Sequence, residues 1–289
     1  MIKASFESLQ LLKGNSFLIR RFNEKSFSAP YHFHPELELT LILKGEGTRF
    51  AGSSMAPFTE GDLVLLGSNL PHCWKSENIK AGINASSLVI QFTYDFLGAG
   101  FLSKTEMQGI EQLLQRSRCG IRFFDQAASH TKESLLLLEK EQDPFLKLLL
   151  FLKILHYLSL SKQFQVLNKA DAVVAHSSSE QKRINNIVAY IVENFRSEIV
   201  LHEVAAIAGM SPTSFCKYYK RMTRKTFFEY VLEYRVNYAT QQLVDTDKPV
   251  AHIGFESGFG DVSHFYKTFK SKKKLSPLQY RKKFMKEVG

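Results

Sequence analysis

Residues 253–281 read IGFESGFGDVSHFYKTFKSKKKLSPLQYR, and the segment about 50 positions upstream repeats much of this pattern. The segments around Gly209 and Gly258 match at an offset of 49, which leaves one extra residue in the second turn. A period of this length indicates one supersecondary unit used twice. At an offset of 50 the aromatic and lysine positions coincide, in the pairs Phe215 and Phe265, Lys217 and Lys267, and Tyr219 and Phe269.

Each copy predicts two helices joined by a tight turn. The first helical pattern ends at Gly209 in one copy and at Gly258 in the other. The next helix begins at Ser211 or Asp261, and both residue types favour helix N-caps. Two helices joined by a short turn that contains glycine form a helix-turn-helix motif. The sequence therefore predicts two such motifs in its last third.

The second helix of each motif has one apolar face and one polar face. Phe215 and Tyr219 are four residues apart, as are Phe265 and Phe269, so each pair lies on one buried stripe. Hydroxyls and lysines on the opposite face suit phosphates and base edges, so we predict that both helices contact duplex DNA. The outward residues are Thr213, Ser214, Lys217 and Lys220 in the first copy and Ser263, His264, Lys267 and Lys270 in the second.

The run at 253–281 resembles the signature of AraC/XylS-type bacterial transcription regulators. The resemblance covers roughly the last 105 residues in family order: first motif, linking helix at 227–244, second motif, then Ser276, Pro277, Tyr280 and Arg281. It implies a DNA-binding regulator rather than an enzyme. It also implies RNA polymerase as a partner and the bacterial cytoplasm as the location.

The resemblance also assigns roles to individual residues. Thr213 and Cys216 are small, so the first motif is expected to read less sequence than the second. The base-reading positions fall on Thr213, Cys216 and Lys217 in the first copy and on Ser263, Tyr266 and Lys267 in the second, with His264 adjacent. The candidates for phosphate contacts are Lys220, Arg221, Lys270, Lys272, Lys273, Arg281 and Lys282.

Two positions depart from the family pattern. The glycine that usually follows each second helix is Arg224 in one copy and Lys274 in the other. A left-handed backbone at a residue with a side chain costs about 1 kcal/mol. We interpret both positions as local strain or an altered helix end, with the fold retained.

The charge of the chain is uneven. Residues 180–289 hold 19 Lys and Arg against 11 Asp and Glu, a balance of +8, whereas the remaining 179 residues contribute +2. A basic segment that also holds the duplicated motif favours a nucleic-acid partner. The linking helix at 227–244 would be about 25 Å long at 1.5 Å per residue. It could therefore hold two reading helices about 34 Å apart, which is one turn of DNA.

The first part of the chain predicts a different architecture. Short alternating runs separated by glycine predict a β-sandwich or barrel, and they lie at 17–27, 37–50, 62–68 and 86–92. The pattern then becomes helical at 105–116, 131–141 and 144–160. The last of these is apolar on most of its circumference, which predicts burial on more than one side. It could pair two subunits into a homodimer, as in the family, or pack against the barrel.

The sequence therefore predicts an α+β chain of two domains. We expect a sensing domain at 1–168, a linker at 169–179 that is rich in serine and charge, and a DNA-binding domain at 180–289. The N-terminus lacks the apolar core of a signal peptide. The apolar stretch at 145–160 is too short to span a bilayer. Cys73, Cys119 and Cys216 form no CxxC motif, which favours a reducing compartment.

A group of histidines marks the strand region. The spacing of His32, His34, Glu38 and Gly45, followed by Gly61 and His72, resembles the two cupin motifs. The resemblance implies a small cupin-like barrel ahead of the DNA-binding part. The second motif departs from the pattern at Gly67, Asn69 and Ser76, where proline, glycine and asparagine are usual.

His32, His34 and Glu38 share strand parity, so on one continuous strand they would point into the barrel, where His72 could join them. Three interpretations stay open: a pocket for a small-molecule effector, a structural hydrogen-bond network, or a site for a divalent metal. Trp74, beside His72, is either a core or rim residue or a pocket wall. No cofactor is predicted.

Two functions from different classes fit these observations. One is a DNA-binding transcription regulator controlled by a small molecule in the N-terminal barrel. The other is a metal-dependent cupin enzyme with a basic helical appendage. The duplicated motif, the uneven charge and the linker all favour the regulator, whereas the histidine group alone supports the enzyme. We therefore predict a regulator.

Overall fold

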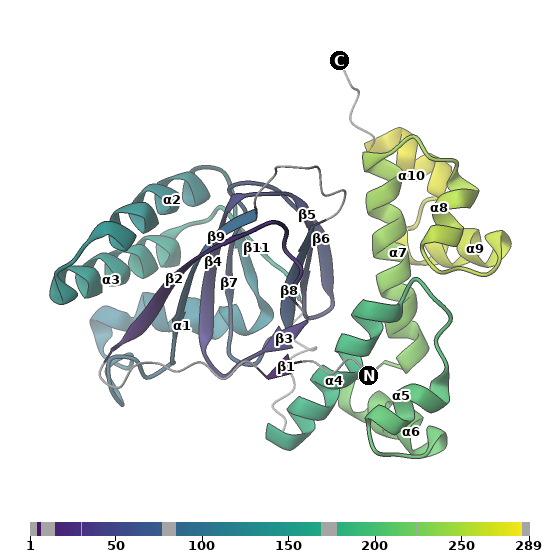
Figure 1. Cartoon of the computed structure of the whole chain (residues 1–289), viewed down its shortest axis with the longest axis horizontal. Coiled ribbons are helices and arrows are strands. Elements are labelled where there is room, and N and C mark those ends of the chain that lie inside the picture. The colour runs from purple at the N-terminus through teal and green to yellow at the C-terminus, as the bar shows by residue number, and fades with distance from the viewer. Residues whose placement is uncertain are drawn as a thin grey trace. The chain divides into compact units, whose positions relative to one another are not determined.

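The computed structural model describes residues 5–6, 15–29, 31–76, 85–168, 178–223 and 225–284. They form two compact units, one within Ser5–Val173 and the other within Val174–Gly289 (Figure 1). Strands dominate the first unit and helices form the second. The α+β organisation predicted from the sequence is therefore confirmed.

The strands of the first unit form two sheets. The larger sheet has the order β11-β10-β7-β4-β9-β2 and the smaller has the order β1-β3-β8-β5-β6. Among the described residues no strand pairing joins the two sheets, so an open pair of sheets stands where a barrel was expected. The strands are Ser5–Phe6 (β1), Phe17–Glu24 (β2), His32–Phe33 (β3), Leu37–Lys44 (β4), Gly47–Ala51 (β5), Ser54–Phe58 (β6), Leu63–Leu66 (β7), His72–Ser76 (β8), Ala85–Phe92 (β9), Ile121–Phe123 (β10) and Phe164–Val166 (β11).

The strand β4 separates two kinds of environment because successive side chains point to opposite faces. Leu39 and Leu41 belong to the apolar core that the larger sheet shares with the helices. Ile42 belongs to a second core, together with residues of the smaller sheet such as Trp74. Glu38 has the parity of Ile42, so its buried carboxylate faces the smaller sheet.

Three helices pack against the larger sheet (Figure 1). They are Gln108–Arg116 (α1), Asp125–Lys140 (α2) and Pro144–Leu160 (α3). Two short 3-10 helices, Thr105–Met107 (η1) and Ser117–Cys119 (η2), flank α1. The helix α2 begins at Asp125 and not at the predicted residue 131. Its first turn is stabilised by a distant side chain, because the backbone N–H of Ala127 donates to Oε1 of Gln163 at 3.0 Å.

The apolar helix α3 is buried on one face only. Its N-terminus is capped by Asp143, whose side chain accepts from the backbone N–H of Leu146 at 2.8 Å. Phe151 and Leu155 are fully buried, whereas the side chain of Phe145 is 66% exposed. The prediction of burial on several sides is therefore wrong. No helix in the described part of the chain is long and apolar enough to cross a membrane.

The second unit is built around one long helix, α7, which contacts α6, α8, α9 and α10. The helix begins with a capping box in which the side chains of Thr226 and Glu229 exchange hydrogen bonds with each other's backbone N–H. The linker predicted at 169–179 lies, up to residue 177, outside the described residues. The helices are Ser178–Asn194 (α4), Leu201–Ile207 (α5), Pro212–Thr223 (α6), Phe227–Asp245 (α7), Val250–Glu256 (α8), Val262–Lys273 (α9) and Pro277–Phe284 (α10).

Two glycines make the turns between α5 and α6 and between α8 and α9. Gly209 has φ = 68° and Gly258 has φ = 87°, a backbone region that side chains disfavour. A Cβ at Gly258 would also lie 2.5 Å from the carbonyl oxygen of Phe195. The turn glycines predicted from the sequence therefore have a steric cause.

The residue after α9 is a lysine in the left-handed region. Lys274 has φ = 63° and ψ = 3°, and its backbone N–H donates to the carbonyl oxygen of Lys270 at 2.9 Å. The strain predicted at this position is therefore present in the backbone. The equivalent position in the first copy, Arg224, lies outside the described residues.

Replacing Lys274 by glycine should raise the free energy of unfolding of the C-terminal unit by up to about 1 kcal/mol, because glycine adopts this backbone without steric cost. Urea unfolding followed by far-UV circular dichroism measures the change. Lys274→Ala is the matched control, since it removes the same charge and keeps a Cβ. A gain of equal size in both variants would assign the effect to charge and not to backbone strain.

Candidate functional sites

The helix α6 presents a polar face. Phe215 and Tyr219 are fully buried. The predicted contact residues Thr213, Ser214, Cys216, Lys217, Lys220 and Arg221 are all exposed. The spacing of the aromatic residues therefore buries one face of α6 in the core. The opposite face exposes hydroxyls, a thiol and basic groups.

The helix α9 has the same design. Its N-terminus is capped by Asp261, whose Oδ2 accepts from the backbone N–H of His264 at 2.6 Å. Phe265 and Phe269 are fully buried. The predicted contact residues Ser263, His264, Lys267 and Lys270 are exposed.

Two lysines at the end of α9 make intramolecular contacts with α7. The ammonium of Lys272 lies 3.2 Å from Oε1 of Glu233. Lys273 is half-buried and donates to Oδ1 of Asn237 at 3.1 Å, and burial lowers the pKa of its ammonium group. Both lysines were predicted to bind phosphate, and in the structure they connect the end of α9 to the middle part of α7.

Three other predicted DNA contacts also touch their own unit. The guanidinium of Arg281 donates to the carbonyl oxygen of Leu243, the third-last residue of α7, at 3.2 Å. Tyr266 packs partly buried against the core of the C-terminal unit. The guanidinium carbon of Arg221 lies 5.8 Å from the ring centroid of Tyr218. The predicted contact residues Lys217, Lys220, Lys267, Lys270 and Lys282 are exposed and thus open to a partner.

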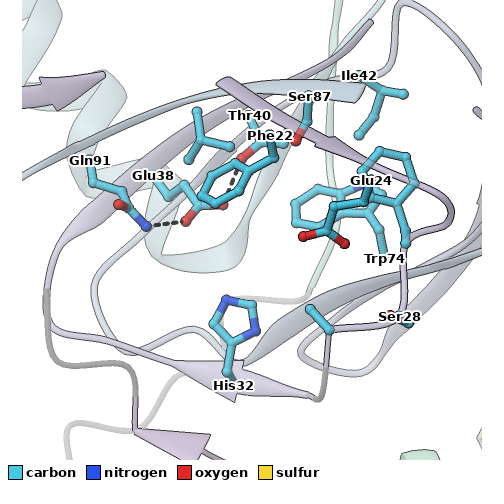
Figure 2. Close-up of a pocket in the computed structure, with 13 residues that line it drawn as sticks. Phe22, Glu24, Ser28, His32, Glu38, Thr40, Ile42, Trp74, Ser87 and Gln91 are labelled. Carbon is cyan, nitrogen blue, oxygen red and sulfur yellow. Dashed lines mark hydrogen bonds between the residues drawn. The ribbon is translucent and has the colours of Figure 1, made fainter. Parts of the chain in front are cut away.

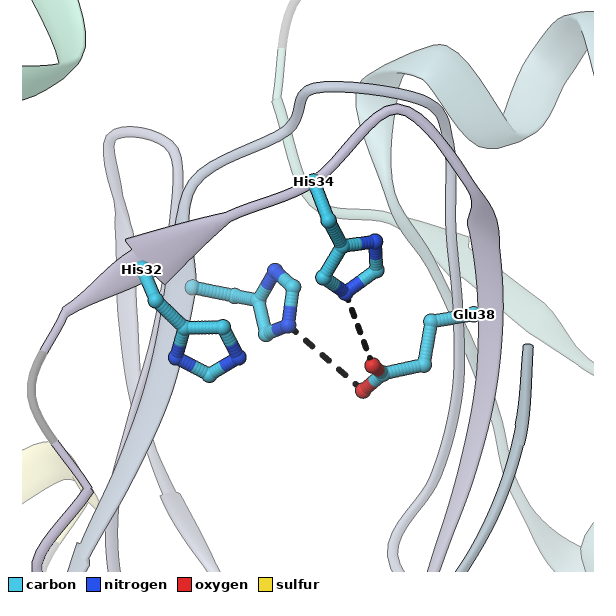
Figure 3. Close-up of side chains that lie close together, drawn as sticks. His32, His34 and Glu38 are labelled. Carbon is cyan, nitrogen blue, oxygen red and sulfur yellow. Dashed lines mark hydrogen bonds and ion pairs between the residues drawn. The ribbon is translucent and has the colours of Figure 1, made fainter. Parts of the chain in front are cut away.

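A second candidate site lies between the two sheets of the N-terminal unit. His32, His34, Glu38 and His72 each offer one ligand atom, and these four atoms lie within 4.8 Å of one another. His32 and His72 are cross-strand partners on β3 and β8, and their ring centroids are 4.4 Å apart. The structure thus brings together the four polar residues that the sequence singled out (Figure 3).

The four side chains meet in a different way from the one predicted. His32 and Glu38 do not share a strand, because β3 ends at Phe33 and β4 begins at Leu37. Between them, at His34, the chain crosses from the smaller sheet to the larger one. The side chains meet because the chain folds over at this crossing, so strand parity is the wrong explanation.

The carboxylate of Glu38 is surrounded by hydrogen-bond donors. Thr40 Oγ1 donates to Oε1 at 2.6 Å and Gln91 Nε2 donates to Oε2 at 2.8 Å (Figure 2). His34 Nε2 lies 3.0 Å from Oε2, and His72 Nε2 lies 3.5 Å from Oε1. Sequence reasoning missed Thr40, which shares the parity of Glu38, and Gln91, which only the pairing of β4 with β9 brings opposite Glu38.

The charge of Glu38 follows from these neighbours. Burial alone would raise the pKa of this carboxyl. Charge attraction from His72 and a hydrogen bond from His34 oppose burial and hold the pKa of Glu38 well below its ordinary value. The group is therefore a carboxylate at neutral pH.

Two of the imidazoles are oriented by the backbone. Nδ1 of His72 lies 2.8 Å from the carbonyl oxygen of Leu70, and Nδ1 of His34 lies 3.2 Å from that of Glu36. A carbonyl oxygen can only accept, so the hydrogen sits on Nδ1 in both rings. Nε2 of each ring lies on the side of Glu38, 3.0 Å from Oε2 for His34 and 3.5 Å from Oε1 for His72.

A cavity adjoins the cluster (Figure 2). Its volume is about 150 Å³, and it is open to solvent on one side. Of the five predicted ligand residues, His32, Glu38 and Trp74 line it, whereas His34 and His72 do not. The remaining lining residues are Phe22, Glu24, Phe27, Ser28, Ala29, Thr40, Ile42, Ser87, Val89 and Gln91.

Comparison with known proteins gives three findings. The family model for a helix-turn-helix domain matches residues 204–283, from α5 to α10. The uncharacterized HTH-type transcriptional regulator YdeC of Bacillus subtilis is 22% identical over 264 residues, which cover 88% of this chain and 86% of that protein. An uncharacterized HTH-type transcriptional regulator in the cgkA 5′ region of Pseudoalteromonas carrageenovora is 31% identical over 113 residues, which cover 37% of this chain and 67% of that protein.

Among solved structures, the chain is similar to a transcriptional regulator of the AraC-type DNA-binding domain-containing proteins from Chromobacterium violaceum. The two are 24% identical with a TM-score of 0.35, and the match covers 39% of this chain and 100% of that chain.

Proposed function

The chain belongs to the AraC/XylS-type bacterial transcription regulators, and we propose that it reads duplex DNA with two helix-turn-helix motifs under the control of a small molecule. Its relatives are named as transcription regulators, so the chain is a regulator and not an enzyme. The proposed motifs are the pairs α5–α6 and α8–α9. The observation that carries this proposal is the repeated face of α6 and α9, where lysines are exposed opposite a buried aromatic stripe.

The proposed division of labour follows the two units. Residues 1–168 would sense the effector, 169–179 would link the units, and 180–289 would bind DNA. In the DNA-binding part, α7 contains 19 residues. At 1.5 Å per residue it is about 28 Å long, which suits two reading helices in successive major grooves.

The two classes of lysine should respond differently to substitution. Lys267→Ala should cost about 1–3 kcal/mol on the preferred sequence and relax the preference, because Lys267 is proposed to reach base edges. Lys270→Ala should weaken binding to all sequences and lower the slope of log K against log salt by about 0.9, since it is proposed to neutralise one phosphate. Fluorescence anisotropy of the full-length protein, with duplexes selected from a random pool and with scrambled duplexes, separates the two effects.

The control for this experiment is Lys132→Ala, which removes a lysine that pairs with Glu60 in the N-terminal unit. It should leave both affinity and salt slope unchanged. If Lys267→Ala and Lys270→Ala lower specific and non-specific affinity by the same factor, the division into base and phosphate contacts is wrong.

The cavity beside Glu38 is the proposed effector site of a cupin-like sensing unit. Its walls combine aromatic side chains such as Trp74 with polar groups such as His32 and Glu38. This mixture suits a small molecule with an apolar body and one polar end. Mass spectrometry of the natively purified protein is the direct search for such a compound, and isothermal titration of the compound it reveals then measures affinity.

Two further partners are proposed. Two apolar side chains of α3 are exposed, Phe145 at 66% and Leu149 at 45% of their surface. They favour a second copy of the chain as a partner, because an interface would remove this apolar surface from water. RNA polymerase is the partner that transcription regulation itself implies. We also propose the cytoplasm as the location, because a bacterial regulator meets its DNA there.

A further inference from the structure

We infer that Glu233 limits the affinity of the C-terminal unit for DNA, because its carboxylate competes with DNA phosphates for Lys225 and Lys272. Glu233 belongs to α7, Lys225 lies just before α7, and Lys272 lies at the end of α9. The inference rests on the proposed DNA-binding function and assigns to one acidic residue a role that opposes binding.

Glu233 holds two lysines at once. The ammonium Nζ of Lys225 lies 2.7 Å from Oε2 of Glu233 and 2.9 Å from Oε1. The ammonium Nζ of Lys272 lies 3.2 Å from Oε1 of the same carboxylate. Two positive groups therefore share one negative group, and neither lysine is a free charge in the unbound protein.

The ion pairs lie between the two proposed reading helices. Lys225 follows the end of α6, and Lys272 is the second-last residue of α9. Glu229, one helical turn before Glu233, is close to both helices as well. Its pKa is lowered first by the hydrogen bonds of the capping box and then by the charges of Lys272 and Lys220. A duplex whose successive major grooves hold α6 and α9 therefore runs its backbone past these carboxylates.

The paired side chains are accessible to a phosphate. The side chain of Lys225 is 45% exposed, that of Lys272 is 36% exposed and that of Glu233 is 23% exposed. Ion pairs with this much exposure contribute little to stability, because water screens them. A phosphate of DNA is also an oxygen anion, so it can replace the carboxylate as the partner of either lysine.

This exchange lowers the gain from DNA binding. Each phosphate that a lysine neutralises releases condensed cations from the duplex, and this release drives sequence-independent affinity. A lysine that leaves Glu233 uncovers a carboxylate, which attracts a cation and offsets part of the release. Removal of the negative charge should therefore strengthen binding to every duplex, whatever its sequence.

The rival explanation is that Glu233 only positions α9 against α7. Both explanations use the same contacts, but they predict changes of opposite sign. If the ion pairs serve only to hold the helix, their loss lets α9 shift and affinity for DNA falls. If Glu233 competes with phosphate, its neutralisation raises affinity.

The test compares the full-length wild type with Glu233→Gln, which keeps the shape of the side chain and removes its charge. Fluorescence anisotropy with a scrambled duplex should show binding that is about 8-fold tighter at about 0.1 M salt. The slope of log K against log salt should become steeper by about 0.9, which corresponds to one additional phosphate contact. Glu60→Gln is the matched control, because it removes the same charge and frees Lys132 in the N-terminal unit. It should change neither the affinity nor the slope.

Glu229→Gln provides a second variant. Glutamine also completes a capping box, so the start of α7 is retained. This variant removes a charge close to Lys220 and Lys272, so it should strengthen binding in the same direction. If Glu233→Gln fails to fold, Glu229→Gln measured against Glu60→Gln decides the question.

The inference is overturned if Glu233→Gln weakens binding to the scrambled duplex, which would assign Glu233 to the positioning of α9. It is also overturned if Glu233→Gln and Glu60→Gln change binding by the same factor, because net charge alone would then explain the effect. A scrambled duplex separates this test from the proposed reading of sequence. A wild type that does not discriminate selected from scrambled duplexes would refute sequence reading, and the comparison of the variants would still hold.

Discussion

Replacing Asp62 by alanine is expected to destabilise the N-terminal unit by about 3–5 kcal/mol, the cost of leaving a buried charge without its partner. Asp62 accepts from the guanidinium Nη1 of Arg49, and both side chains are buried. Arg49 is only 1% exposed, and its Nε makes no hydrogen bond. Without Asp62, the guanidinium would have to remain charged inside the core.

A second arginine on the same carboxylate supplies the control. The Nε of Arg122 donates to the other oxygen of Asp62 at 2.8 Å, but the side chain of Arg122 is 38% exposed. Its loss should cost only about 0–1 kcal/mol, because water can replace an exposed partner. Urea unfolding of Asp62→Ala, Arg122→Ala and the wild type measures both values. Equal losses would show that burial does not determine the strength of this network.

Inserting five base pairs between the two halves of the preferred DNA sequence should reduce specific affinity by about 30-fold or more. The insertion rotates one major groove to the opposite face of the duplex. The rigid helix α7 cannot follow this rotation, so one reading helix loses its base contacts, each worth about 1–3 kcal/mol. Footprinting of the intact site should show two protected segments about 10 base pairs apart.

The matched control is the same five base pairs inserted outside the protected segments. This duplex has the same length and composition, and it should bind as tightly as the original. If the internal insertion also leaves affinity unchanged, only one helix pair engages DNA. In that case α9 would be the helix that reads DNA, since Thr213 and Cys216 of α6 are small and contact bases less well.

Local patterns account for what could be predicted of the C-terminal unit. The spacing of Phe265 and Phe269 at i and i+4 places both in the core and leaves Lys267 and Lys270 exposed. Gly258 marks the turn because its backbone has φ = 87°, a region that side chains disfavour. These signals lie within a few residues of the structure they specify, so a sequence alone is enough to read them.

Contacts between distant segments account for features that the sequence did not reveal. The early start of α2 depends on a hydrogen bond from Ala127 to Gln163, which are 36 residues apart. Lys273 lies on a helix face that looks exposed in isolation, yet it is 36 residues from Asn237, which accepts its hydrogen bond. Gln163 and Asn237 lie too far along the chain for a local sequence pattern to reveal either contact.

The sequence by itself determined the two helix pairs, the uneven charge and the identity of the four polar residues at the histidine cluster. Only the tertiary structure decided how those four residues meet. His32 reaches His72 through the pairing of β3 with β8, and Gln91 reaches Glu38 through the pairing of β4 with β9. The physical reason is that helices form through contacts between residues three or four positions apart, whereas strand pairing and register depend on burial across the whole sheet.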